Sequence, residues 1–405
     1  MHILSSHNHS EFLATPQLVR MEFASDGNDF EPTLLIKGST LLLKYVVLGA
    51  SMQLAFRPHA GRLLCALKIC DDGSDSGILW SIVERDEELN GIRGLASGAP
   101  LTLYLFNELA VNVAWNEVSA QIHQPTLALW ATNTGIGRFN HSAAREKVSS
   151  VLERLNQSVE SDDEWIIYEI GGRSDWKSVN SQFITFSATS SLIDIFDHDE
   201  GNQQEQIVIW LTDNLNPFGV YHSPQIPKGK GTRELTDILL SHEFGAVLIE
   251  SKTLAILTRE QLPDRAKLKR DLSGHIGKAF KQLRGGIRKI KSGINVTSKD
   301  GILLAVERNQ PAHAVVLIPD LDLVDDRDAY GVDFIRDFMN ATGGFPHLLD
   351  ISELLRVVQA AEMIAAKGIT TTPMMAFDFY LRKRAKKAVD AGTLCIEVLL
   401  RFADD

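Results

Sequence analysis

Short apolar runs separated by turn-forming residues make up most of the first two hundred positions. The runs TLLIKG, LLLKYVVL, RLLCALKI, GILWSIVE, PLTLYLFN and AVNVAWNEV have the length and aliphatic content of buried strands, and polar clusters such as DDGSDSG separate them. One segment, SAAREKVSSVLERLNQSVE, instead has its apolar residues at helical spacing. The pattern predicts a β-rich N-terminal domain that contains one or two helices.

Two polar segments mark the middle of the chain. FDHDEGNQQEQ precedes the apolar run IVIWL, for which we expect a strand, and NPFGVYHSPQIPKGKGT follows it. Segments of this composition are typical of domain boundaries. We therefore expect a first domain at residues 1–215, with a sensing or regulatory role that its sequence does not specify, and a second domain at residues 216–405.

The second domain alternates between strand and helix patterns. The run ELTDILLSHEFGAVLIESKTLAIL predicts two strands joined by a turn at Ser241–Gly245. An amphipathic helix, HIGKAFKQLRGGIRKIKSG, follows, and HAVVLIP then has the pattern of a short buried strand. Helices are expected near residues 333–341, 351–366 and 374–391, and LCIEVLLRF is expected as a closing strand. This order predicts an α/β domain with a mixed central sheet and a C-terminal helical extension, so that the whole chain is α+β.

The composition is that of packed globular domains. Of the 405 residues, 44% are hydrophobic and 23% are charged, which excludes an intrinsically disordered chain. Three cysteines without CxxC spacing support neither a disulfide framework nor a cysteine-based zinc site. No signal-peptide pattern occurs, and no run of about 18 apolar residues, so we expect a cytoplasmic protein without membrane contact. GxSxG, HExxH and Walker motifs are also absent from the sequence, which argues against an α/β-hydrolase, a zincin protease and a P-loop ATPase.

One segment departs from the acidic character of the chain. The net charge is −11, yet the 33 residues from Arg259 to Lys291 contain 11 Lys and Arg against three acids. A phosphate backbone responds to the local charge and not to the total. This segment therefore indicates contact with a polyanion, whereas the alternative interpretation is a solvated basic surface, which explains most charge runs.

Three side chains of the predicted hairpin can meet at one point. Asp237 belongs to the first strand, and Glu250 and Lys252 stand at the end of the second. Side chains alternate along a strand, so Glu250 and Lys252 point to the same face. Two carboxylates can hold Mg²⁺, which polarises a phosphate and lowers the pKa of a bound water, and a lysine can position that water or stabilise the charge that develops. The simplest alternative is a solvent-facing ion pair between Glu250 and Lys252.

This arrangement resembles the PD-(D/E)xK, or restriction-endonuclease-like, nuclease superfamily, and within it the nuclease-related (NERD-like) branch. The matching residues are Asp237, twelve intervening residues, the triplet Glu250-Ser251-Lys252, and a following helix that carries Gln282. The resemblance implies an αβββαβ core, with Asp237 and Glu250 as metal ligands, Lys252 assisting the attacking water and Gln282 supporting the site. It covers residues 232–319 and not the N-terminal half.

Two positions depart from the family pattern. Thr236 stands where the proline that names the motif would be. Many members of the superfamily also have an additional acid on an early helix. Glu234 is the nearest candidate for that acid in this chain, and Glu153 on the upstream helix is the alternative.

The basic helix gains a role beside such a site. Five of its side chains are candidates for holding the phosphates that flank the scissile one, which sets register without reading the base sequence: Lys278, Lys281, Arg284, Arg288 and Lys289. The pair Gly285-Gly286 inside the helix costs roughly 1 kcal/mol per glycine relative to alanine, so we expect a close approach there to the sheet or to nucleic acid.

The sequence therefore predicts a Mg²⁺-dependent endonuclease, with one or two ions and with Mn²⁺ as a substitute, that hydrolyses phosphodiester bonds in DNA. A role in bacterial antiviral defence or restriction follows from analogy with nucleases joined to an unrelated module. Expected partners are nucleic acid, a second copy of the chain or a regulatory protein that contacts the N-terminal domain. The alternatives are a non-catalytic binding or scaffold protein that keeps the nuclease fold, and a nuclease directed at RNA.

Overall fold

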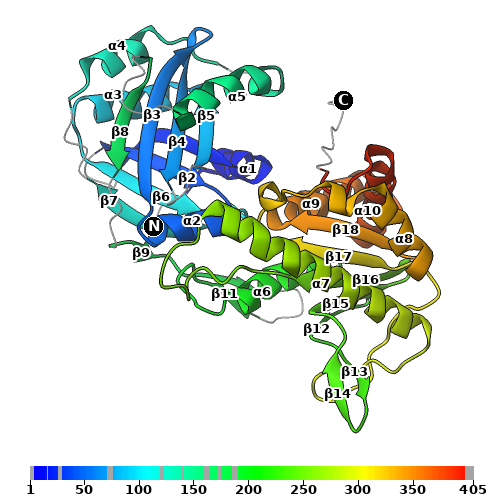
Figure 1. Ribbon diagram of the computed structural model, residues 1–405. Coiled ribbons are helices and arrows are strands. Elements are labelled where there is room, and N and C mark those ends of the chain that lie inside the picture. Colours follow the sequence, from blue (N-terminus) through cyan, green and yellow to red (C-terminus); the bar gives the residue numbers. More distant parts are fainter. Residues whose placement is uncertain are drawn as a thin grey trace. The chain divides into compact units, whose positions relative to one another are not determined.

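The computed structural model is a mixed α/β protein, and it describes residues 4–15, 17–25, 30–70, 76–118, 123–137, 141–157, 164–170, 175–184 and 190–396. The chain divides into two compact units whose segments interleave in sequence (Figure 1). Unit 1 comprises Met1–Ser181, Asp194–Phe196 and Ile256–Arg265, and unit 2 comprises Gln182–Ile193, Asp197–Ala255 and Ala266–Asp405.

Unit 1 contains two sheets. The mixed five-stranded sheet has the order β1 (Leu18–Ser25), β2 (Phe30–Lys37), β6 (Leu101–Phe106), β7 (Asn112–Val118) and β9 (Lys177–Ser178), and its β2 and β6 are parallel. The antiparallel four-stranded sheet has the order β5 (Gly77–Ile82), β4 (Arg62–Cys70), β3 (Ser51–His59) and β8 (Ile166–Ile170). Five of the six runs that were predicted as strands lie in these sheets, so the β-rich character of this part is confirmed.

The expected number of helices was wrong. The described part of unit 1 has five helices: α1 (Ser6–Ala14), α2 (Thr40–Val47), α3 (Asp86–Ala96), α4 (Pro125–Asn133) and α5 (His141–Gln157). Only α5 has the long amphipathic pattern that the sequence analysis used to recognise a helix. The other four are 8 to 11 residues long, which gives periodicity too few turns to be distinctive.

The run LLLKYVVL forms α2 and not a strand. The Ser39 hydroxyl accepts a hydrogen bond from the backbone N–H of Leu42 and so caps the first turn. Side chains on all sides of this helix are buried, including Leu43, Tyr45 and Val46. A helix buried all round shows a continuous apolar run, which is also the pattern of a fully buried strand.

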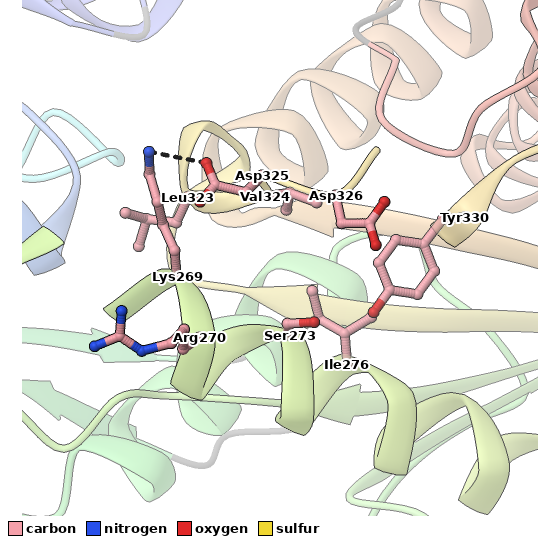
Figure 2. Close-up of a pocket in the computed structure, with 9 residues that line it drawn as sticks. All are labelled: Lys269, Arg270, Ser273, Ile276, Leu323, Val324, Asp325, Asp326 and Tyr330. Carbon is pink, nitrogen blue, oxygen red and sulfur yellow. Dashed lines mark ion pairs between the residues drawn. The ribbon is translucent and has the colours of Figure 1, made fainter. Parts of the chain in front are cut away.

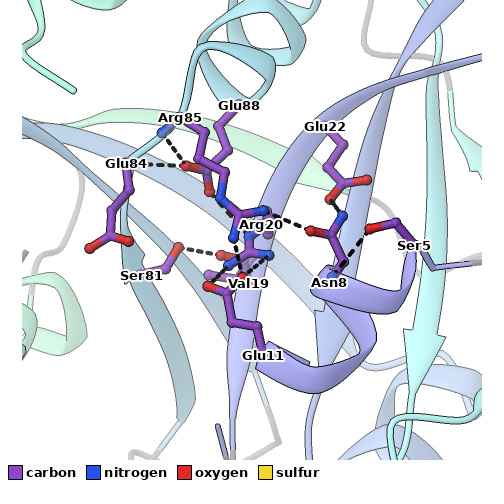
Figure 3. A network of polar contacts seen from close by, with 10 residues as sticks. All are labelled: Ser5, Asn8, Glu11, Val19, Arg20, Glu22, Ser81, Glu84, Arg85 and Glu88. Atoms are coloured by element: carbon purple, nitrogen blue, oxygen red, sulfur yellow. Dashed lines mark hydrogen bonds and ion pairs between the residues drawn. The ribbon is translucent and has the colours of Figure 1, made fainter. Parts of the chain in front are cut away.

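A buried polar network joins α1 to the sheet of unit 1 (Figure 3). The guanidinium of Arg20 on β1 donates to both carboxylate oxygens of Glu11, at 2.5 and 3.2 Å, and its Nε lies 3.3 Å from Glu88 on α3. Arg85 contacts Glu11 as well. Burial raises the pKa of Glu88, although Arg20 and the backbone N–H groups that donate to it act in the opposite direction. The buried Arg20 and Glu88 are both paired in this network. Because Glu11 of α1 also pairs with Arg20, the network holds α1 against β1.

Unit 2 is built on a mixed five-stranded sheet. The strand order is β12 (Gly219–His222), β15 (Ile238–His242), β16 (Gly245–Ser251), β17 (His313–Ile318) and β18 (Phe345–Asp350). β15 is antiparallel to both of its neighbours, β12 and β16, whereas β16, β17 and β18 run parallel to one another. Two-stranded pairs accompany the sheet: β10 (Ser181–Ile184) with β11 (Ser190–Ile193), and β13 (Gln225–Lys228) with β14 (Gly231–Glu234).

The helices of unit 2 are α6 (Glu200–Asp213), α7 (Arg265–Lys291), α8 (Val332–Thr342), α9 (Ile351–Lys367) and α10 (Pro373–Ala391), with short 3₁₀ turns η1 (Leu321–Leu323) and η2 (Asp328–Tyr330). The predicted hairpin, basic helix, HAVVLIP strand and three C-terminal helices are confirmed. The second strand of the hairpin ends at Ser251, so that TLAIL lies outside it, and the basic helix begins at Arg265, ten residues before the predicted segment. The predicted closing strand LCIEVLLRF lies mostly outside the described residues. Among the described residues, no helix is long and apolar enough to cross a membrane.

The expectation of a strand at IVIWL was wrong, because this run belongs to α6. The Asp199 carboxylate accepts from the N–H of Asn202 and caps the helix, and buried Gln204, Val208 and Leu211 recur at helical spacing. The cap lies in a polar segment that the sequence analysis took for a linker. In sequence α6 falls within the predicted first domain, and in the structure it belongs to unit 2.

The two faces of the unit 2 sheet carry different helices. A Cβ atom on Gly286 of α7 would lie 3.0 Å from the side chain of Leu248 on β16, so α7 packs on the face to which even-numbered residues of β16 point, and Figure 1 shows this helix lying along the sheet. His313 on β17 points to the other face, since it pairs with Val247. It contacts Asp378 on α10, so α10 covers the face opposite α7.

Candidate active site

A tight hairpin brings the predicted residues together. His242 pairs with Gly245, which leaves Glu243 and Phe244 as a two-residue loop between β15 and β16. Gly245 has φ of +150°, and a Cβ atom there would lie 2.6 Å from the Pro311 carbonyl oxygen, so only glycine fits. The register that this loop sets pairs Ile238 with Ile249. The residues just before Ile238 and just after Ile249 are therefore neighbours on one face of the sheet.

Asp237, Glu250 and Lys252 converge at that position. The Lys252 ammonium nitrogen lies 2.8 Å from Oε2 of Glu250 and 3.2 Å from Oδ2 of Asp237. The same Asp237 oxygen accepts the backbone N–H of Ser251 at 2.7 Å. Side-chain exposure is 1% for Glu250, 13% for Asp237 and 20% for Lys252. A solvent-facing ion pair, the simplest alternative for Glu250 and Lys252, is excluded because the glutamate is buried.

Burial dominates the electrostatics of Glu250. Loss of hydration, together with the nearby charge of Asp237, raises its pKa to about 7, while Lys252 acts against that shift. Burial lowers the pKa of the Lys252 ammonium, but the charges of Glu250 and Asp237 outweigh it and the net pKa is raised. The lysine is therefore held in its protonated form, and the glutamate changes its charge near neutral pH.

The backbone around Asp237 is fixed from both sides. The Thr236 hydroxyl, at the position where the motif that the sequence resembles has a proline, donates to the carbonyl of Ile249 at 2.7 Å, and Thr236 is itself buried. The carbonyl of Asp237 accepts the N–H of Ser223 at 2.7 Å. Thr236 thus ties the two strands together beside the carboxylates, a role that proline could not fill because its side chain has no donor.

Glu234, one of the two candidates for an additional acid, hydrogen-bonds with Asp237. Burial raises its pKa, and so do a hydrogen bond with Asp237 and the charge of Glu205 on α6. Glu205 pairs at 2.6 Å with His222 on β12. Glu205 was not predicted from the sequence, because its segment was not assigned to a helix. Glu153, the other candidate for the additional acid, lies on α5 in unit 1 and is exposed.

The donor set suits a hard divalent cation. The buried Oε1 of Glu250 has no hydrogen-bond partner among the described residues, and such an unsatisfied carboxylate oxygen is unfavourable unless a ligand or ion meets it. No group of three His, Cys, Asp or Glu side chains gathers in a metal-binding arrangement within the described part of the chain. Asp237 and Glu250 would be the protein ligands, and Mg²⁺ commonly takes its remaining ligands from water and phosphate oxygens.

The approach of α7 to the sheet explains one of its paired glycines. A Cβ on Gly286 would lie 3.4 Å from the side chain of Leu235 and 3.0 Å from that of Leu248, so a side chain there would press into the core. The predicted close approach to the sheet is confirmed for Gly286. Around Gly285 nothing lies within 4 Å, and the fold does not require glycine at that position.

Gln282 occupies a suitable level of α7 for supporting the site. It lies one turn before Gly286 on the same side of the helix, and it is exposed. Because α7 connects the parallel strands β16 and β17, it runs against their direction. One helical turn back from Gly286 is about 6 Å, and the step from Leu248 to Glu250 along β16 is also about 6–7 Å. Gln282 therefore lies at the level of Glu250.

The five candidate phosphate-binding side chains of α7 fall on different sides of the helix. Arg284 stacks over the ring of Phe338 on α8 at 5.4 Å, and Arg288 donates to the carbonyl of Ala341 at 3.2 Å. These two arginines therefore have packing and capping contacts with α8, and the latter contact satisfies a carbonyl at the end of that helix.

The lysines lie elsewhere on α7. Lys278 and Lys289 share the side of Gln282, because their separations of four and seven residues from it are close to one and two full turns. They lie about 60–80° around the helix from Gly286, which faces Leu248 and Leu235. Lys278 is exposed and Lys289 half-buried, and Lys281 points outward and is exposed.

No family model, curated protein or solved structure matches this chain in the comparisons.

Proposed function

We propose that unit 2 is a divalent-metal-dependent nuclease of the PD-(D/E)xK type that hydrolyses phosphodiester bonds in DNA. The observation that carries the proposal is the convergence of Asp237, Glu250 and Lys252 around a buried, unsatisfied carboxylate oxygen. When bound, a Mg²⁺ or Mn²⁺ ion would polarise the scissile phosphate and lower the pKa of a water molecule. Asp237 and Glu250 would hold the ion, and the Lys252 ammonium would orient the attacking water or stabilise the charge on the phosphate.

The order of elements supports the same proposal. Leaving aside the β13–β14 pair, the segment from α6 to β17 runs α6, β12, β15, β16, α7, β17, which is the αβββαβ order that the resemblance implies. The strand that would carry the Glu-x-Lys triplet is central, and the helix that would support the site follows it directly. The exposed Lys278 and Lys281 would bind phosphates on either side of the one being cut.

The test is nicking of supercoiled plasmid DNA with Mg²⁺, with Mn²⁺ and with EDTA. Wild-type protein is expected to nick with either metal and not with EDTA, and Asp237→Asn and Lys252→Ala are each expected to lower the rate at least about 100-fold, as loss of a group that stabilises a transition-state charge does. Asp390→Asn and Lys387→Ala make the same charge changes at exposed positions of α10, on the other face of the sheet, and should cut like wild type.

One observation favours a second candidate, a nuclease fold that binds without turnover. The Lys252 ammonium already bridges the two carboxylates that would hold the ion. If wild type nicks no faster than Asp237→Asn yet shifts the same DNA in a gel, the binding function replaces the enzymatic one. Parallel digestion of single-stranded RNA separates an RNA-directed enzyme from one that cuts DNA.

A further inference from the structure

A pocket of about 190 Å³ opens in unit 2 beside α7. One wall is the N-terminal part of α7, and the other is the η1–η2 segment that follows β17 (Figure 2). The backbone N–H of Lys252 donates to the carbonyl of Leu317 near the end of β17, so this segment begins close to the carboxylate cluster. Ligands of open α/β sheets commonly bind outside the carboxyl ends of strands, where this pocket lies.

The pocket is polar at its ends and apolar at its base. Ile276, Leu323 and Val324 are buried and contribute its apolar surface. Figure 2 shows the cationic side chains of α7 at one end and Asp326 at the other. Pockets for drug-sized ligands usually have volumes of at least ~300 Å³. This pocket is smaller, so it suits a single ring system.

The charged side chains that line the pocket favour one class of ligand over others. Lys269 pairs with the exposed Asp325 at 2.9 Å, and the remaining charged side chains of the lining are the exposed Arg270 at one end and the exposed Asp326 at the other. A free phosphate would gain from Arg270 but would meet two aspartates, and a simple cation would meet Arg270 and Lys269. The fitting ligand has an anionic group at one end, hydrogen-bond donors at the other and flat apolar faces between them.

The walls of the pocket are held in place before any ligand arrives. The Tyr330 ring packs edge-on against Phe334 at 5.5 Å and in a tilted arrangement against Phe280 of α7 at 6.0 Å, and its hydroxyl hydrogen-bonds with Ser273. The carboxylate of Asp326 accepts the N–H of Ala329 at 2.9 Å, which orients it. A preformed site of this kind loses little conformational entropy on binding.

We propose that this pocket binds one nucleotide of the nucleic-acid substrate, with its base against the apolar surface, its exocyclic or ring N–H groups donating to Asp326 and its phosphate at Arg270. Ile276, against which the base would lie, is six residues and about 9 Å along α7 from Gln282, and Arg270, which would hold the phosphate, is twelve residues and about 18 Å from it. Successive nucleotides of a strand rise about 3.4 Å, so the bound nucleotide would lie about three to five positions from the scissile phosphate. Its base must be unstacked to enter, so the preferred substrate has an unpaired nucleotide near the cut.

The inference rests on the proposed function for its ligand class, and it can be tested without catalysis. The probe is a deoxynucleoside 5′-monophosphate, titrated by calorimetry or saturation-transfer NMR into Asp237→Ala protein without divalent metal. Deoxyribose 5-phosphate and inorganic phosphate are titrated in parallel, to separate recognition of the base from recognition of an anion. A protein that fails to cut DNA can still bind the mononucleotide, and one that cuts can fail to bind it, so the two failures are distinguishable.

The expected result is saturable binding of the mononucleotides, led by dGMP, whose ring and exocyclic N–H groups face one carboxylate. Arg270→Ala should weaken this binding roughly tenfold or more, since a hydrogen bond to a charged group contributes about 1.5–3 kcal/mol. Asp326→Asn should weaken dGMP more than dTMP. Lys387→Ala removes one positive charge at an exposed position of α10, on the other face of the sheet, and should leave the affinity unchanged.

Three outcomes would overturn the proposal. They are the absence of saturable binding at millimolar mononucleotide, equal binding of inorganic phosphate, and an Arg270→Ala or Asp326→Asn affinity that stays within twofold of the parent. Both positions are exposed, so loss of folding is not expected to explain a loss of binding. A thermal unfolding curve for each variant establishes that directly.

Discussion

The ammonium nitrogen of Lys252 lies 2.8 Å from the carboxylate oxygen Oε2 of Glu250, and only Ser251 separates the two residues in sequence. They meet because residues i and i+2 of a strand share a face. The glutamate is buried and the lysine is partly exposed, so the pair is asymmetric: water reaches the cation more readily than the anion. The charge state of the glutamate therefore depends on the lysine and on pH.

Replacing Lys252 by Met should destabilise the protein more at pH 8 than at pH 5. At pH 8 the variant would leave the Glu250 anion without its cation, and breaking a buried pair by removing one partner costs about 3–5 kcal/mol. At pH 5 the glutamate, with a pKa of about 7 that the mutation raises further, is protonated and the loss is smaller. Urea unfolding at the two pH values measures the difference, with Lys278→Met as the exposed control. An equal loss at both pH values would contradict this account.

Titration of Glu250 should also appear in the stability of the wild-type protein. Its pKa rises from 4.5 to about 7 on folding, so its contribution is fully present below pH 4.5 and is lost as the pH rises through 7. The span corresponds to about 3 kcal/mol. Glu250→Gln does not titrate, so the free energy of unfolding of wild type minus that of this variant should fall over this window. Asp350, whose pKa is also raised to about 7, is present in both proteins and cancels. A difference that is constant with pH would refute the shift.

Binding of a divalent ion should release a proton at pH 6 and almost none at pH 8.5. A carboxylate must be deprotonated to act as a ligand, and below its pKa of about 7 Glu250 carries a proton that the ion displaces. Calorimetric titration with Mn²⁺ in two buffers of different ionisation enthalpy counts the protons. Glu250→Gln should bind the ion more weakly and release none. Proton release that is the same at both pH values would assign the effect to another group.

The sequence was most informative where a pattern was long or bounded by a distinctive turn. The part of α7 from His275 onward and the hairpin with its Gly245 were predicted, because several turns of amphipathic spacing and a short loop between apolar runs are each specific signals. The convergence of Asp237, Glu250 and Lys252 followed from that hairpin and from strand alternation. These features depend on residues that are near one another in sequence.

Other features depended on tertiary context that the sequence does not display. The apolar run of α2 was taken for a strand because a helix that is buried all round has no polar face. The run IVIWL of α6 was taken for a strand because five apolar residues are too few to show helical spacing. Their caps, Ser39 and Asp199, were the available signal. The burial of Glu250 and the contacts of Arg284 with α8 could not be read from one segment, since each requires a partner that is distant along the chain.

Substitutions on the two sides of α7 should separate binding from stability. Lys278→Ala and Lys281→Ala should weaken DNA binding and each reduce the slope of log affinity against log salt by about 1, with unchanged unfolding. Arg284→Ala and Arg288→Ala should instead lower the free energy of unfolding by about 1 kcal/mol each, as their contacts with Phe338 and with the carbonyl at the end of α8 are lost. Fluorescence anisotropy over a salt series and urea unfolding give the two readouts. If all four variants weaken binding equally with no change in stability, the division between the two sides of α7 is wrong.

Alanine substitutions at the neighbouring glycines of α7, Gly285 and Gly286, should change the free energy of unfolding in opposite directions. Alanine in place of Gly285 meets open space and removes a glycine from a helix interior, so it should raise the free energy of unfolding by about 0.5–1 kcal/mol. Alanine in place of Gly286 gains the same propensity but presses on Leu248 and Leu235, and overpacking of a core typically costs about 1–3 kcal/mol, so this variant should be less stable than wild type. If Gly285 is present for the close approach of nucleic acid, its alanine variant will be more stable and will bind DNA more weakly. Unfolding curves and anisotropy on the same preparations test both parts, and a stabilising Gly286→Ala would show that α7 lies farther from the sheet than the structure has it.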